Sequence, residues 1–173
     1  MMKSIPVWKQ ELSGGVHAAR LASLYCCAPA ETASEAARYA AVLDGLEKTF
    51  GPHAEAGLYS APGRTEIGGN HTDHQHGRVL AGSVNIDMIA AAAPNDKGQL
   101  RVQSEGYDLC IIDLDDLEAR KEEENTTASL LRGECAAFTQ RGAKLAGLDV
   151  YISSNVPKLS LIHISEPTRR SYI

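Results

Sequence analysis

The chain has 173 residues, enough for one domain with a hydrophobic core, and its hydrophobic content of 43% is typical of globular proteins. Its 17 basic and 22 acidic residues give a formal charge of −5, which argues against binding to nucleic acid. No apolar run is long enough to span a bilayer, and the N-terminus lacks the apolar core of a secretory signal. We therefore expect a cytoplasmic protein with neither a membrane nor a nucleic-acid partner.

Two helical regions are predicted in the first third of the chain. Residues 1–30 are expected to form a peripheral helical segment. Thr32 to Phe50 is predicted as an amphipathic helix that stops at Gly51 and Pro52. Its apolar positions recur every three or four residues: Ala36, Ala40, Leu43, Leu46 and Phe50.

The middle of the chain reads as a series of strands. The expected strands are Gly57–Ser60, one or two buried strands within Arg78–Ala93, then Leu100–Ser104 and Leu109–Asp113. Within the long apolar run, Val79, Val84, Ile86 and Ile89 favour extended backbone, and Asp87 is the one charged residue between its first residue and its end. Together these strands predict an antiparallel meander.

The last third adds another helix and another strand. The acidic stretch Asp113–Asn125 is predicted to lie at the solvated surface. Thr127–Leu145 is predicted as a helix with an apolar stripe, closed by Gly147, and Asp149–Ser153 as a strand. Because the strands cluster instead of alternating with helices, the order favours an α+β fold. The four cysteines form no C-x-x-C pair, which indicates free thiols and not a zinc ribbon.

The segment Ala61–Gly77, APGRTEIGGNHTDHQHG, concentrates polar side chains between glycines. Neither nucleotide fingerprint is present in it, since Gly69 stands where a phosphate loop needs lysine and no G-x-G-x-x-G occurs. Three interpretations remain open. The loop satisfies its own backbone, it holds a metal, or it binds a polyhydroxylated ligand. The candidate metal ligands are His71, Asp73, His74 and His76.

Residue chemistry favours the polyhydroxylated ligand. The Asp73 carboxylate can accept hydrogen bonds from two sugar hydroxyls, while His71 and Asn70 can both donate and accept. Arg64 adds a fixed cationic fork that matches phosphate. A cation beside hydroxyl-binding groups indicates transfer of a phosphoryl group to a sugar.

This segment resembles the substrate motif of galactokinases, in the GHMP kinase superfamily, which reads roughly G-R-x-N-[LI]-I-G-E-H-T-D-Y-x-x-G. The matching residues are Gly63, Arg64, Gly69, His71, Thr72, Asp73 and Gly77. The resemblance covers about Arg38 to Lys158. It implies the α+β fold of a GHMP-kinase N-terminal domain, a mixed or antiparallel sheet with helices on one face, here truncated.

The resemblance implies roles for particular residues. Asn70, His71, Thr72 and Asp73 are the substrate-binding candidates, and Arg64, the catalytic candidate, lies near the transferred phosphoryl group. The chain departs from the motif at Glu66, Gly68, His74 and Asn70. Asn70 replaces a glutamate that helps to hold the sugar, so galactose or a related sugar is the expected acceptor. ATP and Mg²⁺ are the expected cofactors of a full-length member.

The resemblance also implies a division of the chain. Residues 1–32 form a helical extension and residues 33–158 an incomplete sugar-binding and kinase domain. Residues 159–173 are a tail without family resemblance, and LSLIHISEPTRR resembles translated sequencing adapter. The glycine-rich ATP loop and the general base do not follow Val156-Pro157. Three hypotheses compete: a truncated, inactive sugar kinase fragment, a non-catalytic sugar-binding module or sensor, and a metalloprotein.

Overall fold

A six-stranded mixed sheet organises the computed structural model, which describes residues 2–69 and 77–157. The strands are β1 (Lys3–Ser4), β2 (Glu55–Gly68), β3 (Leu80–Pro94), β4 (Gln99–Ser104), β5 (Cys110–Asp113) and β6 (Leu148–Ser154). The helices are α1 (Ile5–Ser13), α2 (Ala18–Tyr25), α3 (Ala33–Phe50) and α4 (Thr127–Gln140), with 3₁₀ turns at Pro29–Glu31 and Lys121–Glu123. The α+β class predicted from the sequence is confirmed.

The strand order is β1-β2-β3-β6-β4-β5, so β6, the last strand of the described residues, lies inside the sheet. The pairs β2–β3 and β4–β5 are antiparallel, as the predicted meander requires. The meander is wrong between β3 and β4, because β6 lies between them, antiparallel to β3 and parallel to β4. Strand spacing along the chain carried no information about this insertion.

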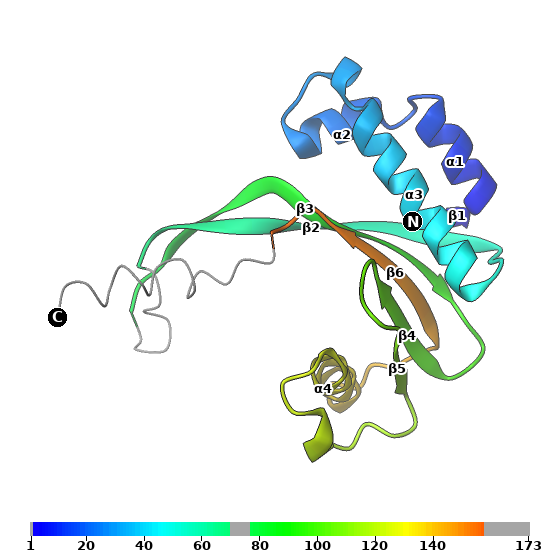
Figure 1. Cartoon of the computed structure of the whole chain (residues 1–173), viewed down its shortest axis with the longest axis vertical. Coiled ribbons are helices and arrows are strands. Elements are labelled where there is room, and N and C mark those ends of the chain that lie inside the picture. The colour runs from blue at the N-terminus through cyan, green and yellow to red at the C-terminus, as the bar shows by residue number, and fades with distance from the viewer. Residues whose placement is uncertain (1, 70–76, 158–173) are drawn as a thin grey trace.

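Helices α1, α2 and α3 cover one face of the sheet (Figure 1). Leu43 and Leu46 of α3 are fully buried against Ile89 and Ala91 of β3, as the predicted apolar stripe requires. Ile5, Leu12, Leu21 and Tyr25 of the first two helices belong to the same core. The N-terminal segment is therefore helical, as predicted, but it packs into the main core. Gly51 ends α3 at φ +92°, where a side chain would be strained.

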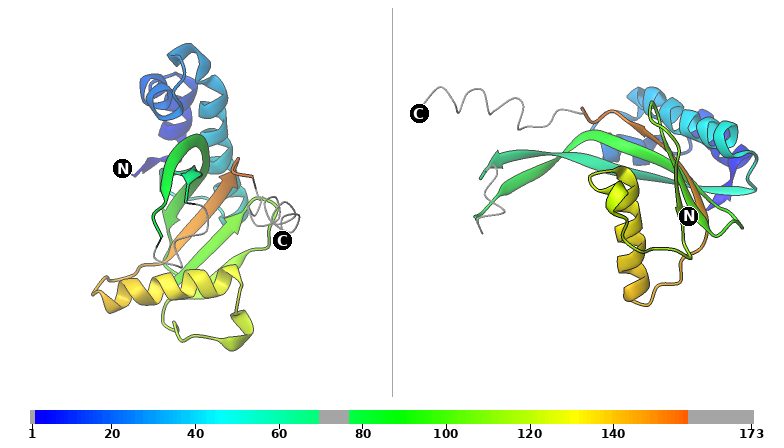
Figure 2. Two further views of the ribbon diagram at one scale, coloured as in Figure 1. Left: turned by 90° about the vertical axis from the view of Figure 1, so that its left-hand side faces the viewer. Right: turned by 60° about the horizontal axis from the view of Figure 1, so that its bottom comes forward.

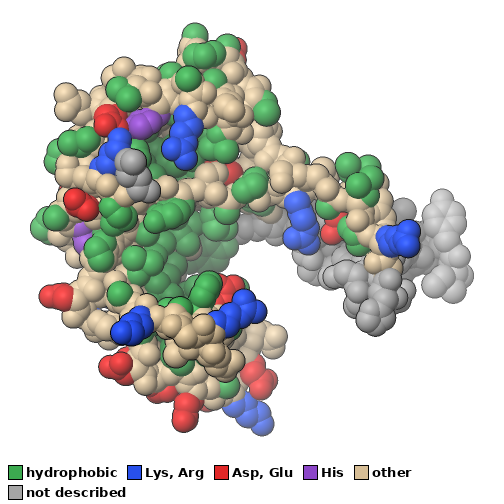
Figure 3. Space-filling view, turned by 180° about the vertical axis from the view of Figure 1, so that it is seen from behind, with side chains coloured by type: hydrophobic (Ala, Val, Ile, Leu, Met, Phe, Trp, Pro, Cys, Tyr) green, Lys and Arg blue, Asp and Glu red, His purple; other side chains and the backbone are tan. Residues whose placement is uncertain are grey.

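Helix α4 lies beside β5, at the opposite end of the molecule from α1, α2 and α3 (Figure 2). It ends at Gln140 and not at Leu145, because Gly142 adopts φ +85°. Its predicted apolar stripe is also wrong, since Leu130 and Phe138 are exposed. Hydrophobic side chains line the hollow between this helix and the body of the sheet (Figure 3).

The strands β2 and β3 form a long hairpin that projects from the helix-covered body (Figure 1). The run Arg78–Ala93 was predicted to be buried, and its buried residues lie in its second half, at Asp87, Ile89 and 91–93. Val79, Leu80 and Ile86 are 42%, 63% and 42% exposed. Those positions lie on the projecting half, where no described helix covers the ribbon.

Two helical glycines offer a stability test with opposite expected signs. A Cβ at Gly45 would overlap the ring of Tyr151, whereas one at Gly133 would meet open space. Replacing Gly45 with alanine should lower the free energy of unfolding by about 1–3 kcal/mol through overpacking between α3 and β6. Replacing Gly133 with alanine should raise it by about 0.5–1 kcal/mol through helix propensity. Urea denaturation of both variants checks this, and equal effects would contradict the packing of Tyr151 against α3.

Candidate functional site

The polar motif connects β2 to β3 at the far end of the hairpin. Residues Ala61–Gly68 belong to β2, and the described residues resume at Gly77 before β3 begins at Leu80. Of the predicted site residues, Arg64 is described. Asn70, His71, Thr72, Asp73, His74 and His76 lie outside the described residues, so the site assignment as a whole stays a prediction.

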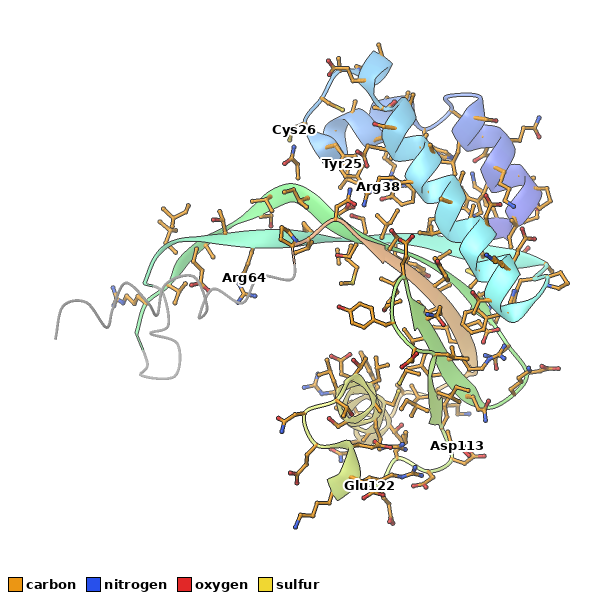
Figure 4. The ribbon with its side chains drawn as sticks, viewed as in Figure 1. Tyr25, Cys26, Arg38, Arg64, Asp113 and Glu122 are labelled. Atoms are coloured by element: carbon orange, nitrogen blue, oxygen red, sulfur yellow. The ribbon has the colours of Figure 1, made fainter. Side chains whose placement is uncertain are left out.

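Arg64 lies on β2 opposite Ser83 of β3, with its side chain 75% exposed. Figure 4 shows it projecting from the hairpin on the side away from α3. One guanidinium nitrogen lies 3.6 Å from Glu66 Oε1, a distance too long for a hydrogen bond. Most of the guanidinium donors therefore face solvent, where they can meet a phosphate or carboxylate group.

Glu66 stands where the family motif has asparagine, and its environment is unusual for a carboxylate. Its side chain is 18% exposed, and its Oε2 atom is buried with no hydrogen-bond partner. Among the described residues, Arg64 forms an ion pair with this carboxylate, with its Nη2 atom 3.6 Å from Glu66 Oε1. The substitution thus adds a negative charge beside the one cation that the motif is predicted to use.

Gly69 begins the connection between the two strands. It has φ +82°, and a Cβ there would collide with the backbone of Arg78. Both observations require glycine, because other residues tolerate neither the left-handed backbone nor this close approach. The position matches a glycine of the motif, and the backbone geometry gives a physical reason for glycine there.

A buried carboxylate lies where the hairpin leaves the body. Asp87 is 2% exposed and accepts hydrogen bonds from Tyr25 Oη at 2.6 Å, Ser60 Oγ at 2.6 Å and Arg38 Nη2 at 3.1 Å. Burial, and then the neighbouring Asp87 carboxylate, raise the pKa of the Tyr25 hydroxyl, so it stays a donor. The sequence analysis did not predict this network. The feature that could have indicated it is Asp87, a charged residue within an apolar strand.

A second buried carboxylate lies at the other end of the sheet. Asp149 is fully buried and accepts two hydrogen bonds from Arg101 and one each from His53 and Asn95. Burial alone would raise its pKa, but the hydrogen bonds from Arg101, His53 and Asn95 outweigh burial and hold the pKa below its ordinary value. This network ties β4 and β6 to the loops beside them, far along the chain from the motif.

A cleft of about 750 Å³ opens between α1, α2 and β2. Trp8, Leu21 and Leu58 contribute apolar walls, and Tyr39 and Ser60 connect the cleft to the network around Asp87. Among its described residues, 61–69 and 77, the segment Ala61–Gly77 contributes none to the lining of this cleft. The cleft therefore lies near the root of the hairpin.

The structure leaves the metal hypothesis as a prediction. Within residues 2–69 and 77–157, no three His, Cys, Asp or Glu side chains form a group that could hold a metal ion. The proposed ligands all lie outside those ranges.

The four cysteines are free, with Cys26 exposed and Cys135 buried. No described helix is both long and apolar enough to cross a membrane.

Comparison with known proteins adds three findings. A family model described as the galactokinase galactose-binding signature matches residues 46–94, from the end of α3 to the end of β3. The galactokinase of Streptomyces coelicolor is 30% identical over 112 residues, covering 65% of this chain and 29% of that protein. The galactokinase of Ligilactobacillus salivarius is 31% identical over 118 residues, covering 66% of this chain and 30% of that protein.

The fold also matches a solved structure, that of Lactococcus lactis galactokinase complexed with galactose. The TM-score is 0.59 at 23% identity, with 68% of this chain and 31% of that chain covered. At this identity the match is evidence for the fold alone. The chain spans about 30% of the length of the curated relatives that it matches.

The fold is that of a solved galactokinase structure, in agreement with the α+β fold expected from the sequence. The resemblance to galactokinases is confirmed by the family model over residues 46–94 and by both bacterial relatives.

Proposed function

We propose that this chain supplies the sugar-binding part of a kinase that transfers the γ-phosphate of ATP to the anomeric hydroxyl of galactose or a related sugar. The galactose-binding signature over residues 46–94 carries the proposal. It spans both strands of the hairpin and the motif that connects them. The relatives named galactokinase support the same reaction class.

The proposed roles follow from the chemistry of each side chain. Asn70, His71, Thr72 and Asp73 hold sugar hydroxyls through donors and acceptors placed along one connection. Arg64, exposed on the adjoining strand, offsets negative charge that develops on the transferred phosphoryl group. Asn70, in place of a carboxylate, brings a donor and no charge, which favours a different set of hydroxyls.

ATP and Mg²⁺ belong to the proposal for the whole protein. In the described part of the chain, no glycine-rich loop opens a helix in the way that phosphate binding requires. We assign no residue here to ATP, to Mg²⁺ or to the general base. The alternative function, a non-catalytic sugar-binding module or sensor, requires the same motif and no phosphate loop.

Galactose binding by the chain tests the proposal directly. Isothermal titration with galactose should show saturable binding. Asp73→Asn should weaken it by about 10- to 100-fold, because two sugar hydroxyls lose a charged acceptor. The control is Asp96→Asn, the same chemical change in an exposed turn, which should leave binding unchanged. Absence of galactose binding in the unmodified chain would reject the proposal for this chain, and metal found after purification without a histidine tag would support the metalloprotein instead.

A further inference from the structure

The hairpin loses its other sheet neighbours at Asp87. Pairing between β3 and β6 stops at Met88 and Ser154, and β1 pairs with Glu55 and Ala56 at the opposite end of β2. From Gly63 to Gly68 and from Leu80 to Ile86, the two strands are paired with each other alone among the described residues. An isolated two-stranded ribbon is marginally stable in water, so this projecting ribbon depends on what holds its root.

Three elements converge on the carboxylate at that root. Tyr25 reaches Asp87 Oδ2 from α2, Ser60 reaches the same oxygen from β2, and Arg38 reaches Oδ1 from α3. Figure 4 shows Tyr25 and Arg38 descending from the helical layer toward the point where β3 enters the projecting ribbon. Both carboxylate oxygens are thus occupied in a site from which water is almost excluded.

Further contacts fasten the same point. The Asn85 side chain donates to the carbonyl oxygen of Tyr25 at 3.4 Å, and the Asn155 amide donates to the carbonyl oxygen of Asp87 at 3.0 Å. The register between β2 and β3 changes between Pro62 and Arg64, immediately beyond the root. A register change bends and twists a ribbon, so the direction of the outer strands is set here.

We propose that Asp87, with Tyr25 and Ser60, is a positioning device that sets the geometry of the sugar motif through the root of the hairpin. The inference rests on the proposed sugar binding at the motif. It adds that the N-terminal helices affect sugar binding indirectly, because they hold the end of the ribbon that lies away from the motif. Asp87 is a positioning residue and touches no substrate.

The projecting ribbon is sensitive to this network because few other contacts hold its root. Removing the hydroxyl of Tyr25 or Ser60 leaves a buried carboxylate short of a donor, which favours conformations that let water in. The ribbon strands end at Gly68 and Leu80, and the candidate sugar-binding residues lie between these two positions in the sequence. A change of conformation at the root therefore moves both ends of the ribbon. The fraction of molecules with a binding-competent motif then falls, and the apparent affinity for the sugar falls with it.

The test uses conservative variants in the whole 173-residue chain, each with a matched control. Tyr25→Phe and Ser60→Ala each delete one hydroxyl that donates to Asp87. Tyr151→Phe and Ser153→Ala delete the same hydroxyls from β6, where Tyr151 packs on α3 and Ser153 donates to Glu105. All four variants are compared at a temperature at which each is fully folded.

Two measurements separate the outcomes. In Tyr25→Phe and Ser60→Ala, amides of residues 64–66 and 81–83 should exchange about tenfold faster with solvent deuterium, while those of β4 keep their rates. Galactose should bind about fivefold more weakly to the same two variants, as a smaller competent fraction requires. The control variants should change neither quantity.

The positioning role is overturned if the root variants and the controls exchange alike in the ribbon, or if exchange rises equally in β4. It is also overturned if the ribbon loosens while galactose affinity stays constant. If the unmodified chain binds no galactose, the proposed function fails for this chain. The exchange rates then still decide whether Asp87 holds the ribbon.

Discussion

Replacing Asp149 with alanine is expected to lower the free energy of unfolding by about 3–5 kcal/mol, because a buried ion pair that loses one partner leaves the other charge uncompensated. Arg101 donates to both carboxylate oxygens and is itself mostly buried against the ring of Phe50. His53 and Asn95 lose the same acceptor. Denaturant titration at neutral pH measures the effect.

The control for this prediction is Asp44→Ala. Asp44 pairs with Lys9, and its side chain is 68% exposed, so its loss should change stability by less than about 1 kcal/mol. An effect of Asp149→Ala as small as that of the control would show that the buried network contributes little to the fold.

The same network predicts a pH dependence. The folded-state pKa of Asp149 lies below its ordinary value of 3.8. Its stabilising contribution is therefore complete above that value and is lost as pH falls through the folded-state pKa. The difference in unfolding free energy between the original chain and Asp149→Ala should be constant near neutral pH. It should narrow once the pH falls below 3.8. A difference that widened in acid would contradict the lowered pKa.

Replacing Arg64 with alanine should reduce phosphoryl transfer by about 10²–10³-fold, the usual effect of removing a group that stabilises transition-state charge. The assay requires a protein that contains this sequence and is as long as the galactokinase relatives. It measures the sugar phosphate formed from ATP. Sugar affinity should change little, since the proposed contact is made to the phosphoryl group.

Two further variants sharpen this prediction. Arg64→Lys keeps the charge but loses the fork, so it should recover part of the lost rate. Arg20→Ala removes one positive charge from an exposed position on α2 and should leave turnover unchanged. Equal losses of turnover and sugar affinity in Arg64→Ala would place the side chain in ground-state binding instead.

The sequence predicted the helices and strands better than it predicted which strands lie side by side in the sheet. The α3 helix followed from the spacing of Leu43 and Leu46, and β4, β5 and β6 from short apolar runs between turns. The position of β6 between β3 and β4 could not be read from spacing, because strand order depends on contacts between distant residues. The end of α4 was wrong since the positive φ at Gly142 ends the helix before the apolar pattern does.

The candidate site was predicted mainly from its motif. The Arg64 side chain is 75% exposed, and its proposed catalytic role stays a prediction. Asp87 stood out in the sequence as a lone charge, but its partners Tyr25, Arg38 and Ser60 come from three separate elements. No pattern along the chain connects residues so far apart, whereas the folded sheet brings them together.

The insertion of β6 into the middle of the sheet has a consequence for biosynthesis. Met88 pairs with Ser154 and Leu100 with Leu148, so β3 and β4 are joined through β6, which is synthesised after both of them. If the β2–β3 and β4–β5 hairpins form before β6 is available, β3 and β4 each expose an unpaired edge. Such edges favour association between chains, so slow translation after Pro94 should increase the demand for chaperones.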